Sequence, residues 1–288
     1  MSAPETVQLE TTQIALRTAG NPAGLPIVFM HGVGGNTGDF AQQFDGPLAE
    51  RFRLIGFDLP GHGNSTPSTD PDRDYTIGGL AAIAAEVIDR LELGRVLLFG
   101  WSLGGHIAIE MMSRHPRKLA GVMLSGAPPF GSGPLSMLRA FKIRREMRLA
   151  AREIYSRRDA EEAARVIYGQ DTTEARIEAV LNTDGAIRPR VNRSFAHGDR
   201  ANQARVVETS MIPLAVVNGA DDPLVRLSYF DDIDYANLWE RRAFRIEGAG
   251  HAPFLSHPNS FNAVLYRFAS DMALRETLPL PAVLSQSA

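Results

Sequence analysis

Short, continuously apolar runs bounded by Gly and Pro alternate along this chain with stretches of helical spacing. The runs are predicted strands at 27–30, 53–57, 95–99, 121–125, 213–218 and 243–247, and the clearest helices are predicted at 77–91, 103–114 and 260–273. Residues 7–17 alternate as one further strand would. A strand that is apolar at every position is buried on both faces, as in a parallel sheet covered by helices. The sequence therefore predicts an α/β fold with a doubly wound, mostly parallel sheet.

The alternation stops after residue 128 and resumes near residue 211. The intervening residues show helical patterning without a convincing strand, and a structureless loop of that length is uncommon in a compact domain. We therefore predict a helical cap at 129–210, inserted over the sheet. The core would comprise 1–128 and 211–275, and residues 276–288 would form a C-terminal tail.

The composition excludes several classes of protein. The 288 residues include no cysteine, which rules out disulfides, thiolate nucleophiles and zinc–thiolate sites. The net charge of −3 gives no overall bias toward nucleic acid. No secretory signal is visible, and no apolar run reaches the ~18–20 residues of a membrane span. We expect a cytoplasmic protein that neither binds nucleic acid nor inserts into a membrane.

One segment of the predicted cap, residues 139–158, is basic. It carries eight Lys and Arg residues against two Glu. It could form a surface for anionic lipid or nucleic acid, but no aromatic residues interleave with the basic ones as a nucleic-acid surface would need. We favour a solvated helix face, because four apolar residues at helical spacing would face inward. These four are Ile143, Met147, Ala150 and Ile154.

The most specific motif is Gly100-Trp101-Ser102-Leu103-Gly104, which fits G-x-S-x-G. It follows a predicted strand and opens a predicted helix, so the chain must turn sharply at Ser102. Glycine on both sides removes the Cβ atoms that would clash in such a turn. The turn would place the hydroxyl at the carboxyl end of the sheet, where ligands of open α/β folds bind. Ser102 is the predicted nucleophile.

A serine nucleophile requires a base and an acid that orients the base. Of the seven histidines, His251 lies in the loop directly after the last predicted strand and fits the chain order Ser…Asp…His. The acid should follow the penultimate strand, where Asp221 and Asp222 are both candidates. For the oxyanion, we predict two backbone donors, the N–H groups of Leu103 and of Val33 in the Gly-rich loop after the first core strand. No metal-binding or nucleotide-binding motif is present, and we expect no metal and no cofactor.

These motifs, in this order, resemble the α/β-hydrolase superfamily. HGVGG, DLPGHGNS, GWSLGG, NGADDP and GAGHAPF cover nearly the whole chain outside the predicted cap. FGWSLGGHIAIEMM, AVVNGADDP, NLWE and AGHAPF are most similar to the metal-independent N-acyl-homoserine-lactone lactonases and related esterases. The resemblance places the acid at Asp222, where the lactonases carry Glu. It also shows Val33 at a position where they carry Asn.

The resemblance implies hydrolysis of a small-molecule ester or lactone with an acyl chain, in particular quorum quenching by hydrolysis of N-acyl homoserine lactones. Ser102, Asp222 and His251 would form the catalytic triad. Five apolar residues are candidate substrate contacts, namely Trp101, Phe130, Leu138, Phe141 and Tyr155. A general carboxylesterase acting on short acyl esters would share every catalytic residue. A ligand receptor that keeps the triad on the same fold is a more distant alternative.

Overall fold

The computed structural model of the chain describes residues 5–197 and 199–277, in which eight strands form one sheet. The strand order is β1-β2-β4-β3-β5-β6-β7-β8. The first two strands are antiparallel to their neighbours, whereas β3 to β8 run parallel to one another and to β4. The bounds are β1 Glu5–Gln8, β2 Gln13–Gly20, β3 Pro26–Met30, β4 Arg53–Phe57, β5 Val96–Trp101, β6 Leu119–Ser125, β7 Leu214–Gly219 and β8 Phe244–Ile246. The predicted doubly wound, mostly parallel sheet is confirmed.

The single strand predicted at residues 7–17 is wrong, because the chain forms the hairpin of β1 and β2 there. The two strands are joined by a turn in which the Leu9 N–H donates a hydrogen bond to the Thr12 carbonyl at 2.9 Å. The polar and apolar residues alternate with the same period on both sides of this turn. A period-two pattern therefore could not reveal where the chain reverses.

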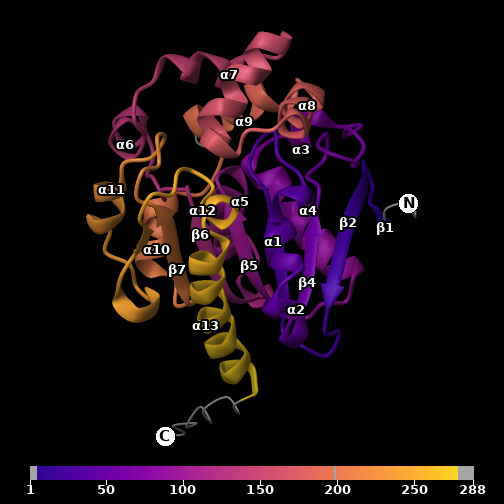
Figure 1. The fold of residues 1–288 in the computed structure, drawn as a ribbon, viewed down its shortest axis with the longest axis vertical. Helices are drawn as coiled ribbons and strands as arrows, with labels where there is room; N and C mark the ends of the chain where they lie inside the picture. Colours follow the sequence, from indigo (N-terminus) through magenta and orange to yellow (C-terminus); the bar gives the residue numbers. More distant parts are fainter. Residues whose placement is uncertain (1–4, 198, 278–288) are drawn as a thin grey trace, which may run out of the picture.

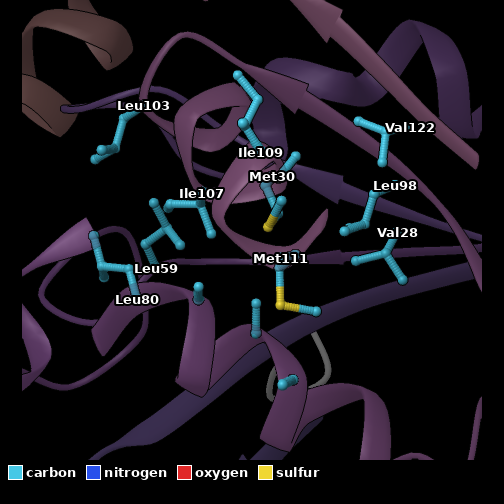
Figure 2. Close-up of a cluster of buried hydrophobic side chains, with 14 of the residues drawn as sticks. Val28, Met30, Leu59, Leu80, Leu98, Leu103, Ile107, Ile109, Met111 and Val122 are labelled. Carbon is cyan, nitrogen blue, oxygen red and sulfur yellow. The ribbon is translucent and has the colours of Figure 1, made fainter. Parts of the chain in front are cut away.

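Successive residues of the central strands feed two separate cores, one on each face of the sheet. Val28 and Met30 of β3 pack on one face with helices α4 and α5, whereas Ile27 and Phe29 pack on the other face with α13. Figure 2 shows part of the first core, where strand residues meet side chains of α5, among them Val28, Met30, Leu98, Val122, Ile107, Ile109 and Met111. Burial on both faces explains why these strands are apolar at every position.

Helices α4 and α13 flank the sheet, and α5 follows the turn at the end of β5 (Figure 1). The bounds of the helices outside the cap are α1 Ala41–Phe44, α2 Pro47–Arg51, α3 Pro71–Asp74, α4 Ile77–Arg90, α5 Leu103–Arg114, α11 Leu227–Asp231, α12 Pro253–Ser256 and α13 Pro258–Thr277. Short 3₁₀ helices lie at Thr37–Phe40, Pro116–Lys118 and Trp239–Arg241. Part of the expected tail, residues 276 and 277, continues α13, and residues 278–288 lie outside the described residues.

The segment between β6 and β7 is helical, and α7, α8 and α9 lie above the sheet in Figure 1. Its helices are α6 Pro134–Ala140, α7 Arg157–Tyr168, α8 Glu174–Asn182, α9 Ile187–His197 and α10 Gln203–Thr209, with 3₁₀ turns at Arg145–Ala151 and Gly169–Asp171. The last helix, α10, packs beside α5 at the flank of the sheet. We use the word cap for α6 to α9 and their connections.

The basic segment 139–158 is not the continuous helix that its spacing predicted. Helix α6 ends at Ala140, a 3₁₀ turn follows, and α7 begins only at Arg157. Ile143 and Ile154 are 71% and 82% exposed, so they do not face inward. Several of the basic side chains instead pair with acidic residues of the cap; Arg148 contacts Glu162 at 2.9 Å, for example. Such ion pairs have no sequence period, so the spacing could not predict them.

Among the helices in residues 5–197 and 199–277, none combines the length and the apolar content that a bilayer-spanning helix needs.

Candidate active site

Ser102 occupies a strained turn between β5 and α5. Its φ of 52° and ψ of −115° lie in a backbone region that residues other than glycine rarely adopt. The turn requires close backbone approach: a Cβ on Gly100 would lie 2.3 Å from the Gly104 carbonyl oxygen, and one on Gly104 would lie 2.2 Å from the Met30 carbonyl oxygen. The two motif glycines are therefore required by contact with backbone. They leave the Ser102 hydroxyl at the carboxyl edge of the sheet.

A buried histidine–carboxylate pair lies at the same edge. His251, in the loop after β8, donates a hydrogen bond from Nδ1 to Asp222 Oδ2 at 2.7 Å, and the two residues are 3% and 0% exposed. The Asp222 Oδ1 atom accepts hydrogen bonds from the Leu224 and Val225 amides at 2.7 and 3.2 Å. Asp221, the other candidate, is exposed. The structure thus brings Asp222, and not Asp221, to His251.

The surroundings of Asp222 keep its carboxyl group ionised. Burial alone would raise the pKa, but the neighbouring His251 and the two backbone amides outweigh burial and hold the pKa below its usual value. With Nδ1 of His251 donating to this carboxylate, Nε2 is left as the acceptor nitrogen. That is the protonation state required of a general base.

Strand β6 connects the nucleophile turn to the histidine loop. The Ser102 amide donates to the Ser125 carbonyl at 2.8 Å, and the ring of His251 packs on the next residue, Gly126. A Cβ on Gly126 would lie 2.5 Å from Cε1 of His251. Any side chain at Gly126 would therefore displace the imidazole.

The two predicted oxyanion donors lie beside Ser102. Val33 and Leu103 line the same cavity as the serine, and neither amide donates to an acceptor among the described residues. A Cβ on Gly32, the residue before Val33, would lie 3.1 Å from the Ser102 Cβ, which shows how closely the two loops approach. Two N–H groups without acceptors beside a serine hydroxyl form a suitable site for a developing oxyanion.

The cavity over Ser102 has a volume of about 230 Å³ and is mostly apolar. Two of the five predicted substrate contacts, Phe141 and Tyr155, line it; Trp101, Phe130 and Leu138 are not among its lining residues. Phe130 is buried behind the wall, and Leu138 is 47% exposed. The remaining lining residues are Val33, Leu103, His106, Met137, Ala150, Arg188, Val191, Asn192 and Phe195.

Trp101 supports the histidine loop. Its indole Nε1 donates to the His251 carbonyl oxygen at 2.8 Å, and its ring packs against those of Tyr168 and Phe254. Tyr168, at the end of α7, in turn donates from its hydroxyl to the buried Asp39 at 2.9 Å. The same carboxylate pairs with Arg176 of α8 at 3.1 Å. The cap is thus anchored to the core next to the residue that holds His251.

Three polar residues of the cavity were missed from sequence. His106 lies one helical turn after Ser102, and burial lowers the pKa of its imidazole to about 4, so the ring is neutral at pH 7. Arg188 and Asn192 lie one turn apart on α9. A signal for Arg188 and Asn192 was available in the sequence. Positions 188, 191, 192 and 195 have the spacing of one helix face, and two of these four residues are polar.

A second, larger cavity of about 750 Å³ has His251 and Asp221 in its wall. Within residues 5–197 and 199–277, no group of three or more His, Asp or Glu side chains is arranged to hold a metal ion.

Comparison with known proteins identifies related enzymes. The model of the alpha/beta hydrolase family matches residues 27–264. A pimeloyl-[acyl-carrier protein] methyl ester esterase from Nitrosospira multiformis is 25% identical over 277 residues, covering 89% of this chain and 99% of that protein. The solved N-acyl homoserine lactonase AidH, complexed with N-butanoyl homoserine, is 37% identical with a TM-score of 0.91, covering 97% and 100% of the two chains. The esterase RhEst1 from Rhodococcus sp. ECU1013 is 25% identical with a TM-score of 0.74, covering 94% and 100%. The predicted similarity to such lactonases and esterases is confirmed.

Proposed function

Because the chain belongs to the alpha/beta hydrolase family, it is a hydrolase, and we propose that it opens the lactone ring of N-acyl homoserine lactones through an acyl-enzyme on Ser102. The observation that carries the proposal is the convergence of three features at one edge of the sheet. These are the strained serine turn, the buried His251–Asp222 pair and two backbone amides without acceptors. The similarity to a lactonase of known structure supports the choice of substrate.

In the proposed reaction, Ser102 Oγ attacks the lactone carbonyl carbon while His251 Nε2 takes the hydroxyl proton. The amides of Val33 and Leu103 hold the resulting oxyanion. The ring C–O bond then breaks, and His251 returns the proton to the departing alkoxide, which stays attached as the homoserine hydroxyl. A water molecule, deprotonated by His251, then attacks the acyl carbon. The bond to Ser102 Oγ breaks, His251 returns the proton to that oxygen, and the acyl-homoserine is released as the carboxylate. Asp222 holds the imidazole in the required tautomer throughout and stabilises its cationic form.

The apolar cavity over Ser102 is the proposed acyl site. Its volume of about 230 Å³ lies below the ~300–1,000 Å³ that is usual for pockets that bind drug-sized ligands. This volume favours short and medium acyl chains over long ones. Phe141 and Tyr155 supply contact with the chain, and the cap closes the cavity from above.

Hydrolysis of short acyl esters is the second candidate, and one residue favours it. Val33 places an apolar side chain in the wall beside Ser102, where the lactonases that the sequence resembles carry an amide. A plain ester needs no hydrogen bond at this position, so the loss would affect lactones more than esters.

The test is a substrate panel with purified protein. N-acyl homoserine lactones with acyl chains of four to twelve carbons are compared with nitrophenyl esters of the same acids, with and without EDTA. We expect turnover of short- and medium-chain lactones that EDTA leaves unchanged and that Ser102→Ala abolishes. Activity on the esters without turnover of any lactone would contradict the lactonase proposal and support the carboxylesterase alternative. Loss of activity in EDTA, restored by zinc, would contradict the serine mechanism.

A further inference from the structure

Arg188 is a buried cation in the wall of an apolar cavity. The residue is 5% exposed, yet it makes no ion pair with a carboxylate in the described part of the chain. Its guanidinium stacks over the Tyr155 ring, with Cζ 3.8 Å from the ring centroid. Leaving a charge in such a position is costly unless its hydrogen bonds are satisfied.

Part of the guanidinium is satisfied by backbone. Nε donates to the Arg152 carbonyl at 3.0 Å, and Nη2 donates to the Glu153 carbonyl at 2.9 Å. The third nitrogen, Nη1, donates to no acceptor among the described residues, although Arg188 lines the cavity with Ser102. Two of the five N–H donors of the cation are thus used, and three remain available, two on Nη1 and one on Nη2.

Asn192 is a second polar group on the same face of α9. It lies one turn after Arg188, lines the same cavity, and its side-chain amide makes no hydrogen bond to the rest of the described chain. The neighbouring positions on this face, Val191 and Phe195, are apolar. The face thus combines a hydrocarbon surface with the Asn192 amide and the free N–H groups of Arg188, which have no partner among the described residues.

From this arrangement we infer that the cavity selects acyl groups that carry an oxygen on the chain, such as an oxo or hydroxyl group, which Arg188 and Asn192 bind. The inference rests on the proposed function and specifies its substrate class. A substrate amide offers one acceptor oxygen, which satisfies one of the two groups. The other polar group contacts only hydrocarbon unless the acyl chain of the substrate carries an oxygen of its own.

The free end of the Arg188 guanidinium provides the donors for a substrate oxygen. A guanidinium has two edges that each present a pair of parallel N–H donors. The edge formed by Nε and Nη2 is already occupied by the two backbone carbonyls. The other edge, formed by Nη1 and the second N–H of Nη2, remains for an oxygen of the acyl chain.

Matched substrate pairs test the inference. The lactone pair is N-hexanoyl and N-(3-oxohexanoyl) homoserine lactone. The open-chain pair is the ethyl esters of N-hexanoylglycine and N-(3-oxohexanoyl)glycine, which keep the same number of bonds between the scissile carbonyl and the oxo group. For each pair, the measured quantity is the ratio of kcat/KM for the oxo substrate to that for the plain substrate. A hydrogen bond to a charged group corresponds to a ratio of about ten or more in the wild type.

Three variants assign the ratio to the two residues. Arg188→Met removes the donor, Asn192→Leu removes the amide, and Arg193→Met makes the same chemical change at an exposed position of α9. We expect Arg188→Met to bring the ratio close to one. Asn192→Leu should lower the ratio, and Arg193→Met should not change it.

A wild-type ratio near one overturns the inference, as does a high ratio that survives Arg188→Met. If Arg188→Met does not fold, Asn192→Leu decides, and an unchanged ratio in that variant overturns the inference. Failure of the proposed function has a different signature, since both lactones would then be inert while the glycine esters still report the oxo preference.

Discussion

Asp222→Asn should lower kcat by about 10⁴-fold with the fold intact, because the substitution forces the wrong tautomer on His251. In the wild type, Oδ1 of Asp222 accepts from the Leu224 and Val225 amides, and Oδ2 accepts from His251 Nδ1. Asparagine has one acceptor oxygen for these two positions. If the oxygen stays at the backbone, it keeps two hydrogen bonds; if it faces His251, it keeps only one. The first orientation is favoured by about 1 kcal/mol, so the NH₂ group should face the imidazole.

With an NH₂ donor beside it, Nδ1 must become the acceptor, and the ring proton moves to Nε2. That nitrogen can no longer take the proton of Ser102. Loss of the correct tautomer in a serine triad costs about 10⁴ in kcat, or ~5 kcal/mol of transition-state stabilisation.

The assay is steady-state hydrolysis of a nitrophenyl ester, with circular dichroism and a urea midpoint to confirm folding. Asp221→Asn is the matched control, since it makes the same change one residue earlier on an exposed side chain. We expect that control to stay within about threefold of wild type. A crippling Asp221→Asn beside a mild Asp222→Asn would refute the assignment of the acid.

Three other predictions concern the cavity. Burial lowers the pKa of His106 in the folded state to about 4, from an ordinary value of 6.5. Between pH 6.5 and pH 4 the unfolded chain therefore binds more protons than the folded chain does. The free energy of unfolding should fall by up to about 3 kcal/mol as the pH drops through this range. His106→Gln should flatten this part of a plot of unfolding free energy against pH, and an unchanged slope would contradict the assignment. Phe141→Ala should shift the preferred acyl length upward by widening the cavity, whereas Leu138→Ala, outside the cavity lining, should leave the chain-length profile unchanged. Val33→Asn should raise the ratio of lactone to ester turnover by roughly tenfold, the equivalent of about 1–2 kcal/mol for one added hydrogen bond, and a lower ratio would show that the amide does not reach the substrate.

The sheet could be predicted from sequence because burial on both faces leaves a direct record in the residues. Each central strand is a continuous apolar run, and the structure places β3 to β8 within a few residues of the predicted runs. The turn at Ser102 left a record for a similar reason, since backbone approach at Gly100 and Gly104 permits only glycine. The order of strand ends along the chain predicted Ser102 as nucleophile and His251 as base, but it left Asp221 and Asp222 as alternatives, and only the family resemblance favoured Asp222.

The cap could not be predicted at the same level. Its ion pairs join residues far apart in sequence, such as Arg157 with Glu174 and Glu178, and such pairs have no period. The role of Trp101 could not be predicted either, because a tryptophan next to a nucleophile can contact the substrate as readily as it can support a neighbouring loop. Only the three-dimensional position of the His251 carbonyl shows the indole to be a support.

The anchoring of the cap has a consequence for engineering. Tyr168 and Arg176 fix the cap to Asp39, and Tyr168 also packs on the indole that holds the histidine loop. Helix α9 forms the cavity wall and takes no part in that anchor. A mutant library aimed at new substrates should therefore diversify the cavity face of α9 and leave Tyr168 and Arg176 unchanged. Libraries that vary the anchor would lose active clones at a rate unrelated to the substrate used for selection.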